Sequence, residues 1–227
     1  MPDRSTTHQS IVFHARKGER PKLVHRLDRD TSGLLVVART AAAARELSFA
    51  IQQHKVRKLY WSLLLKGPER NQGLIDLPLA KEGPSGQEKM RHRAHEEDPD
   101  GTGRNARTRF MVLARAGKVA AWTALMPLTG RTHQLRAHAA LIGCPIVGDG
   151  KYGGNSQENT GEGWGAQLGG GVSRKLHLHA RSLSLVHPRT GARLDLTAPL
   201  PPHMARTWDL FGWRPQDAPA DPFEEMR

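Results

Sequence analysis

Residues His25 to Leu35 read HRLDRDTSGLL, and this stretch is the most informative part of the chain. Two arginines, Arg26 and Arg29, flank the carboxylate of Asp28, and the small polar turn TSG follows. The apolar run at 34–38 comes next and is typical of a buried strand. Cations beside a carboxylate favour its ionised form. The pattern therefore predicts a carboxylate that is held charged at the edge of a core, near an anionic partner.

The charge of the chain indicates the nature of that partner. The 227 residues contain 34 Lys+Arg against 22 Asp+Glu, a formal net charge of +12. Such an excess predicts a polyanionic partner, and nucleic acid fits best because no basic amphipathic helix stands out for a membrane surface. No apolar run is long enough to span a membrane, and the N-terminus lacks the apolar region of a signal peptide. The single cysteine, Cys144, fits a reducing cytoplasm.

Strands in pairs with a few helices predict an α+β class with a mainly antiparallel mixed sheet and flanking helices. We expect residues 80–105 to form a loop, or two strands that a long loop joins. Residues 153–171 read as a mobile surface loop. Expected strands lie at 34–38, 58–65, 108–114, 119–125, 176–186 and 194–197. Expected helices lie at 41–54 with Thr40 as N-cap, from Thr129 or Gly130 to about Ile142, and after Pro201-Pro202.

A second informative segment runs from Gly130 to His138 and reads GRTHQLRAH. If a helix starts at Thr129 or Gly130, Arg131 lies in its first turn, where a cation opposes the helix dipole. An anion against it makes that position favourable, and either Asp28 or an RNA phosphate would serve. Helical spacing turns Arg136 away from Arg131. One arginine is therefore expected to hold a carboxylate while the other faces solvent or phosphate.

A metal site is the alternative use of the histidines in this region. His133 and His138 are five residues apart, which is not the spacing of a helical metal pair, and His177 and His179 bring no cysteine partners. We therefore expect no metal. The apolar surroundings of Cys144 favour a core position over a nucleophilic one.

Together these segments resemble the RluA family of RNA pseudouridine synthases. The family's catalytic segment matches His25 to Gly33, and its Lys-x-Tyr motif matches Lys58-Leu59-Tyr60. Its Arg-x-His-Gln-x-Arg-x-His motif matches the segment ending at His138. Later blocks match at 145–153, 176–180 and 187–188, so the resemblance extends from about Pro21 to Trp208.

The resemblance implies a pseudouridine synthase catalytic fold and a mechanism without cofactor or metal. Asp28 would be the nucleophile, Tyr60 would stack on the target base and assist at C5, and Arg131 would pair with Asp28. Arg26 would brace the gap left by the extruded uridine. Leu176 or Leu178 would form an apolar pocket wall. The residues expected to bind RNA are Arg26, Arg29, His133, Gln134 and Arg136.

The resemblance further implies a monomer that acts on RNA, with large-subunit ribosomal RNA preferred and tRNA as the alternative. We expect a loose segment at 1–20, a catalytic domain at 21–213 and a frayed tail at 214–227. Only 27 residues precede Asp28, so the family's Lys-Pro-x-Gly strand and the S4 domain of many members are missing from the sequence. Two other classes stay open. One is a non-catalytic RNA-binding assembly factor, and the other is a hydrolytic glycosidase using Asp30 as a second carboxylate.

Overall fold

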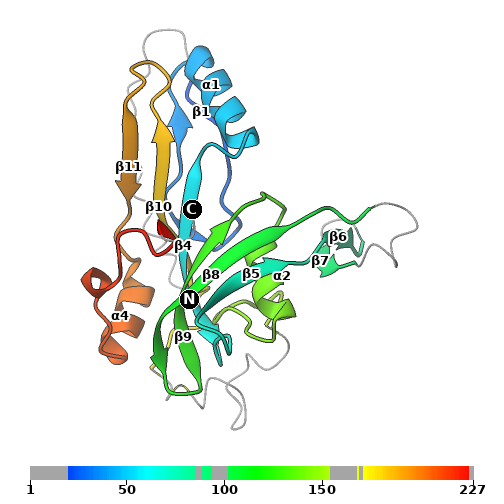
Figure 1. Ribbon diagram of the computed structural model, residues 1–227, viewed down its shortest axis with the longest axis vertical. Helices are drawn as coiled ribbons and strands as arrows, with labels where there is room; N and C mark the ends of the chain where they lie inside the picture. The colour runs from blue at the N-terminus through cyan, green and yellow to red at the C-terminus, as the bar shows by residue number, and fades with distance from the viewer. Residues whose placement is uncertain (1–19, 85–87, 94–101, 154–167, 169–170, 225–227) are drawn as a thin grey trace, which may run out of the picture.

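The computed structural model describes residues 20–84, 88–93, 102–153, 168 and 171–224, which are built around one seven-stranded sheet (Figure 1). Six strands follow the order β11-β10-β4-β9-β8-β5 with antiparallel neighbours, and β2 pairs in parallel with β10. The predicted α+β class with a mainly antiparallel mixed sheet is confirmed. The strands are β2 Ser32–Gly33, β4 Arg57–Leu65, β5 Gln72–Asp76, β8 Arg107–Ala116, β9 Ala120–Pro127, β10 Leu178–Val186 and β11 Arg193–Thr197.

Helices cover both faces of the sheet. Successive side chains of a strand point to opposite faces, so Leu63 and Leu64 of β4 enter different cores. Leu63 lies in the cluster that contains Trp208 of α4 (Pro202–Leu210). Leu64 lies in the cluster that contains Leu135 of α2 (Gln134–Leu141). The central strands are therefore buried on both sides, which explains their nearly continuous apolar sequence.

The segment before the first helix differs from the prediction of one strand at 34–38. It contains β1 (Lys22–Leu23), which pairs with β3 (Val37–Ala38), and β2 lies between them in sequence. Gly33 has a φ of +111°, which glycine adopts without strain. The chain turns there from pairing with β10 to pairing with β1, so the apolar run is divided between two short pairings.

The first helix was predicted correctly. Helix α1 spans Ala41–Gln52, and the Thr40 side chain accepts a hydrogen bond from the backbone N–H of Ala43 at 3.1 Å. A threonine in this position satisfies one of the free amides of the first turn. Leu47 is buried against the outer part of β10, in a cluster with Leu183 and Leu185. Helix α1 thereby fastens the N-terminal segment to the sheet.

Two strands occur in the region that the sequence left open between a loop and paired strands. Strand β6 (Leu79–Glu82) pairs with β7 (Lys89–His92), and the ribbon extends away from the main sheet (Figure 1). The edge strand β5 was not predicted. Its five residues include Gly73, which weakens the sequence pattern typical of a strand. The strand is ordered because it pairs with β8.

The C-terminal part was predicted to be a frayed tail from 214, and this prediction is wrong. A short 3₁₀ helix, η3, spans Pro215–Asp217. Phe223 is fully buried in the core cluster of α4, and Asp221 forms a paired ion contact with Arg57 of β4. A buried aromatic ring and an ion pair keep the chain against the sheet as far as Glu224. The predicted loose segment at 1–20 and the predicted loop at 153–171 lie almost wholly outside the described residues.

Within the described part of the chain, none of the helices has both the length and the apolar character that a membrane span requires.

Candidate active site

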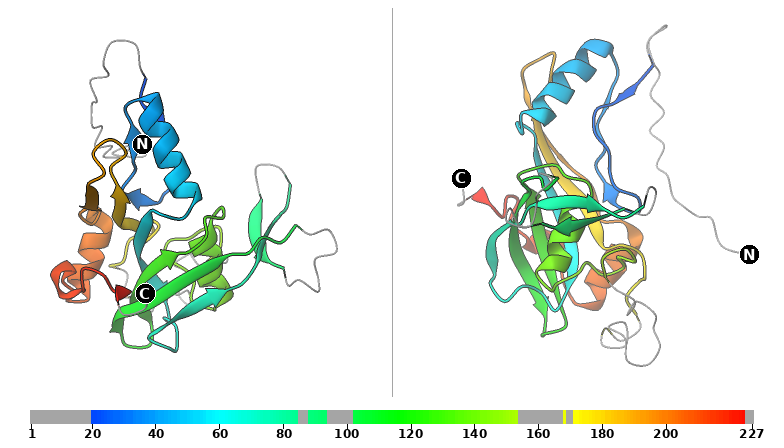
Figure 2. Two further views of the ribbon diagram at one scale, coloured as in Figure 1. Left: turned by 45° about the horizontal axis from the view of Figure 1, so that its top comes forward. Right: turned by 90° about the vertical axis from the view of Figure 1, so that its right-hand side faces the viewer.

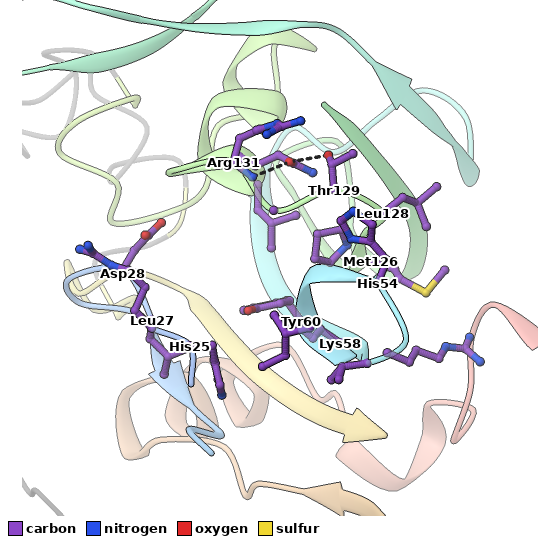
Figure 3. Close-up of a pocket in the computed structure, with 18 of the residues that line it drawn as sticks. His25, Leu27, Asp28, His54, Lys58, Tyr60, Met126, Leu128, Thr129 and Arg131 are labelled. Carbon is purple, nitrogen blue, oxygen red and sulfur yellow. Dashed lines mark hydrogen bonds between the residues drawn. The ribbon is translucent and has the colours of Figure 1, made fainter. Parts of the chain in front are cut away.

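A cleft of about 890 Å³ lies between the N-terminal segment, strand β4 and the loop that precedes α2 (Figure 3). Asp28 enters it from the N-terminal segment, Tyr60 from β4 and Arg131 from the loop (Figure 3). Leu178 of β10 and Leu135 of α2 supply apolar wall. The structure thus brings the three predicted catalytic residues to one cavity from segments that are distant in sequence.

Asp28 sits on a tight turn. The backbone N–H of Thr31 donates to the Asp28 carbonyl at 3.0 Å, and Asp30 adopts a left-handed φ of +69°. This turn separates Asp28 from β2 and leaves its side chain partly buried at the cleft. Burial and then the Asp28 charge raise the pKa of Tyr60, whereas burial lowers the pKa of His133 and the Asp28 charge partly opposes that shift.

Tyr60 is placed by the central strand. Its alternation with Leu59 puts the ring on the α2 side of the sheet, at the rim of the core cluster of that face. Burial, followed by the Asp28 charge, raises the pKa of Tyr60 to about 12. The phenol therefore stays protonated at neutral pH. It can stack on a base or share its proton in a hydrogen bond, but it is a poor base.

The helix of the second segment starts later than predicted. Helix α2 begins at Gln134, and His133 before it has a left-handed φ of +49°. The Gln134 side chain accepts from the Thr129 hydroxyl at 2.7 Å and from the Arg131 backbone N–H at 3.1 Å. Its amide donates to the Arg107 carbonyl and the Thr108 hydroxyl. These bonds hold residues 129–131 as a loop, so Arg131 is not in a first helical turn.

Two of the predicted RNA-binding residues, Gln134 and Arg136, are buried and bonded to other groups of the protein, and Gln134 also lines the cleft. Gln134 is 4% exposed, and its four hydrogen-bonding positions are filled by the bonds above. Arg136 is buried and forms two 2.7 Å bonds with the carboxylate of Asp149. Asp149 also accepts the backbone N–H groups of Lys151 and Tyr152, so it braces the turn that follows it. Helix α2 starts four or five residues later than predicted, and all its residues from 134 to 139 are buried, so Arg136 also lies inside the protein.

The predicted contact between Arg131 and Asp28 is not present. Arg131 is exposed, and its Nε donates to the Asn105 carbonyl at 3.0 Å. In the described part of the chain, no ion pair joins it to Asp28, although both line the cleft. The pKa of Arg136 is raised on balance. Burial lowers it, but the bonds to Asp149, the Asp149 charge and the Asp28 charge raise it by more.

The other predicted contact residues divide by position. Arg26 is exposed and lines the cleft, whereas Arg29 is exposed but lies outside its lining. His133 is half-buried, and its Nδ1 lies 3.1 Å from the Tyr152 hydroxyl. Leu178 lines the cleft, while Leu176 is buried in the α2 core and does not.

Sequence reasoning gave no role to the cations deeper in the cleft. Lys58 lies two residues before Tyr60 and on the same face of β4, where burial lowers its pKa. Its charge, after burial, contributes to lowering the pKa of His25 to about 4. Arg109 of β8 also lines the cleft. The strand period could have revealed Lys58, since the motif Lys-x-Tyr spaces the two residues by one full repeat.

Possible metal ligands do not cluster in the described residues: no group of three or more His, Cys, Asp or Glu side chains could hold an ion. His177 is bonded to the Thr207 hydroxyl and the Lys175 carbonyl, and His179 to the Ser32 hydroxyl. Cys144 is buried, as predicted. Each of these side chains is part of the core.

The chain matches a family model described as RNA pseudouridylate synthase over residues 2–141. An RNA pseudouridine synthase of Zymomonas mobilis is 43% identical over 187 residues, which cover 80% of this chain and 74% of that protein. The ribosomal large subunit pseudouridine synthase C of Vibrio cholerae is 33% identical over 183 residues, which cover 81% of this chain and 53% of that protein. The chain thus spans about half the length of the second relative.

A solved structure shares the fold. Human RNA pseudouridylate synthase domain containing 4 superposes with a TM-score of 0.69 and 28% identity, covering 88% of this chain and 78% of that one. The fold is shared with RNA pseudouridine synthases. The chain belongs to the RNA pseudouridine synthase family, and more narrowly to its RluA branch.

Proposed function

We propose that this protein converts uridine to pseudouridine in large-subunit ribosomal RNA, with Asp28 as the nucleophile and without a cofactor. It acts as a cytoplasmic monomer. The observation that carries the proposal is the lining of the cleft. Among the described residues that line it, Asp28 is the only carboxylate, and Tyr60 lies on the strand that faces it (Figure 3).

The chemistry follows from these two groups. An Asp28 oxygen attacks either C1′ of the ribose or C6 of the base, and the bond between N1 and C1′ breaks. The uracil turns, C5 bonds to C1′, Asp28 is released, and the proton on C5 is transferred to solvent while N1 gains one. Tyr60 stacks on the base. Its pKa of about 12 favours stacking over removal of the C5 proton.

The surroundings of the cleft suit a polyanion. Arg26, Lys58, Arg109 and Arg131 line it together with one carboxylate. Such a cavity attracts the phosphates that flank an extruded nucleotide. The preference for large-subunit ribosomal RNA rests on the name of the Vibrio cholerae relative, and tRNA is the alternative substrate.

Tritium release tests the proposal. Purified protein is incubated with ribosomal RNA transcripts that carry 5-tritiated uridine. We expect release with the wild type and none with Asp28→Asn, which should still bind the transcript. The matched control is Asp30→Asn, because Asp30 is exposed, lies outside the cleft lining, and has a left-handed φ that asparagine tolerates. Wild-type protein without release on ribosomal RNA and tRNA would overturn the proposal.

Two further readouts separate the other classes. Free uracil in place of pseudouridine would indicate hydrolysis, which usually uses a second carboxylate, and the lining of the cleft offers none in the described residues. Full rescue of a deletion strain by Asp28→Asn would indicate a non-catalytic assembly factor. Mapping pseudouridines in the RNA of that strain identifies the modified position.

A further inference from the structure

Strand β10 holds the segment that carries Asp28. His179 and Ala180 pair in parallel with Ser32 and Gly33, and the Leu34 backbone N–H donates to the Ala180 carbonyl at 3.0 Å. The contact is close: a Cβ atom on Gly33 would overlap the Ala180 carbonyl oxygen and lie 2.7 Å from its nitrogen. Of the strand pairings in the described chain, this one alone joins residues 20–38 to the seven-stranded sheet.

One side chain strengthens this junction. The Nδ1 atom of His179 lies 2.9 Å from the Ser32 hydroxyl, and its Nε2 lies 3.4 Å from the Ala198 carbonyl. His179 is 2% exposed. Burial, followed by the charges of Arg181 and His203, lowers its pKa to about 4, although the Ala198 carbonyl acts in the opposite direction. The ring is therefore neutral at pH 7. The Ala198 carbonyl can only accept, so Nε2 carries the proton and Nδ1 accepts the Ser32 hydroxyl at 2.9 Å, a shorter contact than the 3.5 Å from that hydroxyl to the Leu178 carbonyl.

Ser32 connects this bond to the nucleophile. It follows Asp28 by four residues, and the turn between them is closed by the bond from the Thr31 N–H to the Asp28 carbonyl. A shift of Ser32 would move the turn and change where the carboxylate lies in the cleft. A displacement of about 1 Å in a reacting group can reduce a rate about 100-fold.

His177 provides the internal comparison. It lies two residues before His179, is also fully buried, and burial with the His203 charge lowers its pKa to about 4 as well. Its bonds run elsewhere, to the Thr207 hydroxyl of α4 at 2.9 Å and to the Lys175 carbonyl at 2.8 Å. Two neighbouring histidines of similar burial thus serve different elements.

We propose that His179 is a positioning residue for catalysis: by accepting the Ser32 hydroxyl, it fixes the turn that carries Asp28 against the sheet. The inference rests on the proposed function, because it assigns Asp28 as the nucleophile. Ser32 is the second positioning residue, because its hydroxyl makes this contact with His179.

The test measures kcat and KM for tritium release. We expect His179→Phe, which keeps a ring but removes both nitrogens, to lower kcat about 10- to 100-fold and to leave KM within about threefold. His179→Asn places an amide near the former Nδ1 and should recover most of the loss. Ser32→Ala should lower kcat similarly, and the double variant should be no worse than either single one. His177→Phe is the control and should keep kcat.

A second measurement does not depend on activity. Amide exchange at Thr31 and Leu34 should accelerate in His179→Phe and Ser32→Ala but not in His177→Phe. A wild-type kcat together with unchanged exchange in His179→Phe or in Ser32→Ala would overturn the inference. A loss of kcat in His177→Phe equal to that in His179→Phe would overturn it as well. If His179→Phe does not fold, Ser32→Ala decides. If the wild type has no activity on any RNA, the proposed function fails while the exchange result still tests the contact.

Discussion

Asp28 and Tyr60 face one cleft from scaffolds of opposite kinds. Tyr60 lies on a nine-residue strand that pairs on both sides with β9 and β10 and is buried on both faces. Asp28 lies in a segment whose three strands have two residues each, and one two-residue pairing joins it to the main sheet. The cleft is thus rigid on the side of Tyr60 and held by few backbone contacts on the side of Asp28. The position of the Asp28 carboxylate therefore depends on few contacts.

The largest effect is expected on the rigid side. Asp149→Ala leaves the buried Arg136 guanidinium without its carboxylate, and we expect the free energy of unfolding to fall by about 3–5 kcal/mol. Urea denaturation measures it. Replacing both partners, with Arg136→Met and Asp149→Leu, should recover only part of the loss, because the Lys151 and Tyr152 amides still lose their acceptor. A single variant as stable as the wild type would show that this side of the cleft does not depend on the pair.

The next effect separates the two scaffolds. Gly33→Ala introduces a Cβ into the Ala180 backbone at a φ of +111°, so we expect the N-terminal segment to lose about 2–3 kcal/mol of local stability. Hydrogen exchange should accelerate at Leu34 but not along β4. The control is Gly117→Ala in the β8–β9 turn, where φ is +54° and nothing lies within 4 Å of the new Cβ. Equal acceleration in both regions would mean that they unfold together.

Acid should loosen the Asp28 side further. His25 Nε2 accepts the Val36 backbone N–H at 2.9 Å, and burial, with the Lys58 charge, lowers the pKa of His25 to about 4. In the unfolded chain a histidine has a pKa of about 6.5, so between pH 4 and 6.5 the unfolded state binds more protons than the folded state. The stability of the segment is therefore complete above about pH 6.5 and falls as the pH drops toward 4.

Amide exchange at Val36, corrected for its intrinsic pH dependence, measures this loss. Ala43 is the internal reference because its N–H is bonded to the Thr40 hydroxyl, which does not titrate in this range. Protection at Val36 that is constant from pH 7 to 4 would contradict the prediction.

The smallest effect concerns the helix that fastens the segment to the sheet. Thr40→Ala removes the N-cap of α1 and should lower stability by about 1 kcal/mol, whereas Thr40→Ser should retain most of it. Thermal unfolding of the three proteins checks this. A loss confined to α1 and residues 20–38 in exchange experiments would sharpen the contrast between the two scaffolds.

The sequence was most informative where the signal is local. The Thr40 cap, the β8–β9 hairpin and the strand that carries Tyr60 follow from short-range periodicity and turn chemistry, and all three were predicted. Local pattern failed at Gln134, whose side-chain bonds to Thr129 and Arg107 delay the start of α2. It failed again at Phe223. A polar segment that contains prolines is typical of a frayed end, and only the folded structure shows that the Phe223 ring is buried in the core.

The sequence by itself determined the class of the fold, the family and several residues that line the cleft, among them Asp28, Tyr60 and Arg131, because motifs and periodicity are properties of neighbouring positions. Only the tertiary structure decided which arginine is buried beside Asp149, which one is exposed, and which histidine contacts Ser32. The Arg136 pair spans 13 residues and the bond from Ser32 to His179 spans 147. Such choices follow from the distances between segments that fold against each other, and these distances are not encoded in any local pattern.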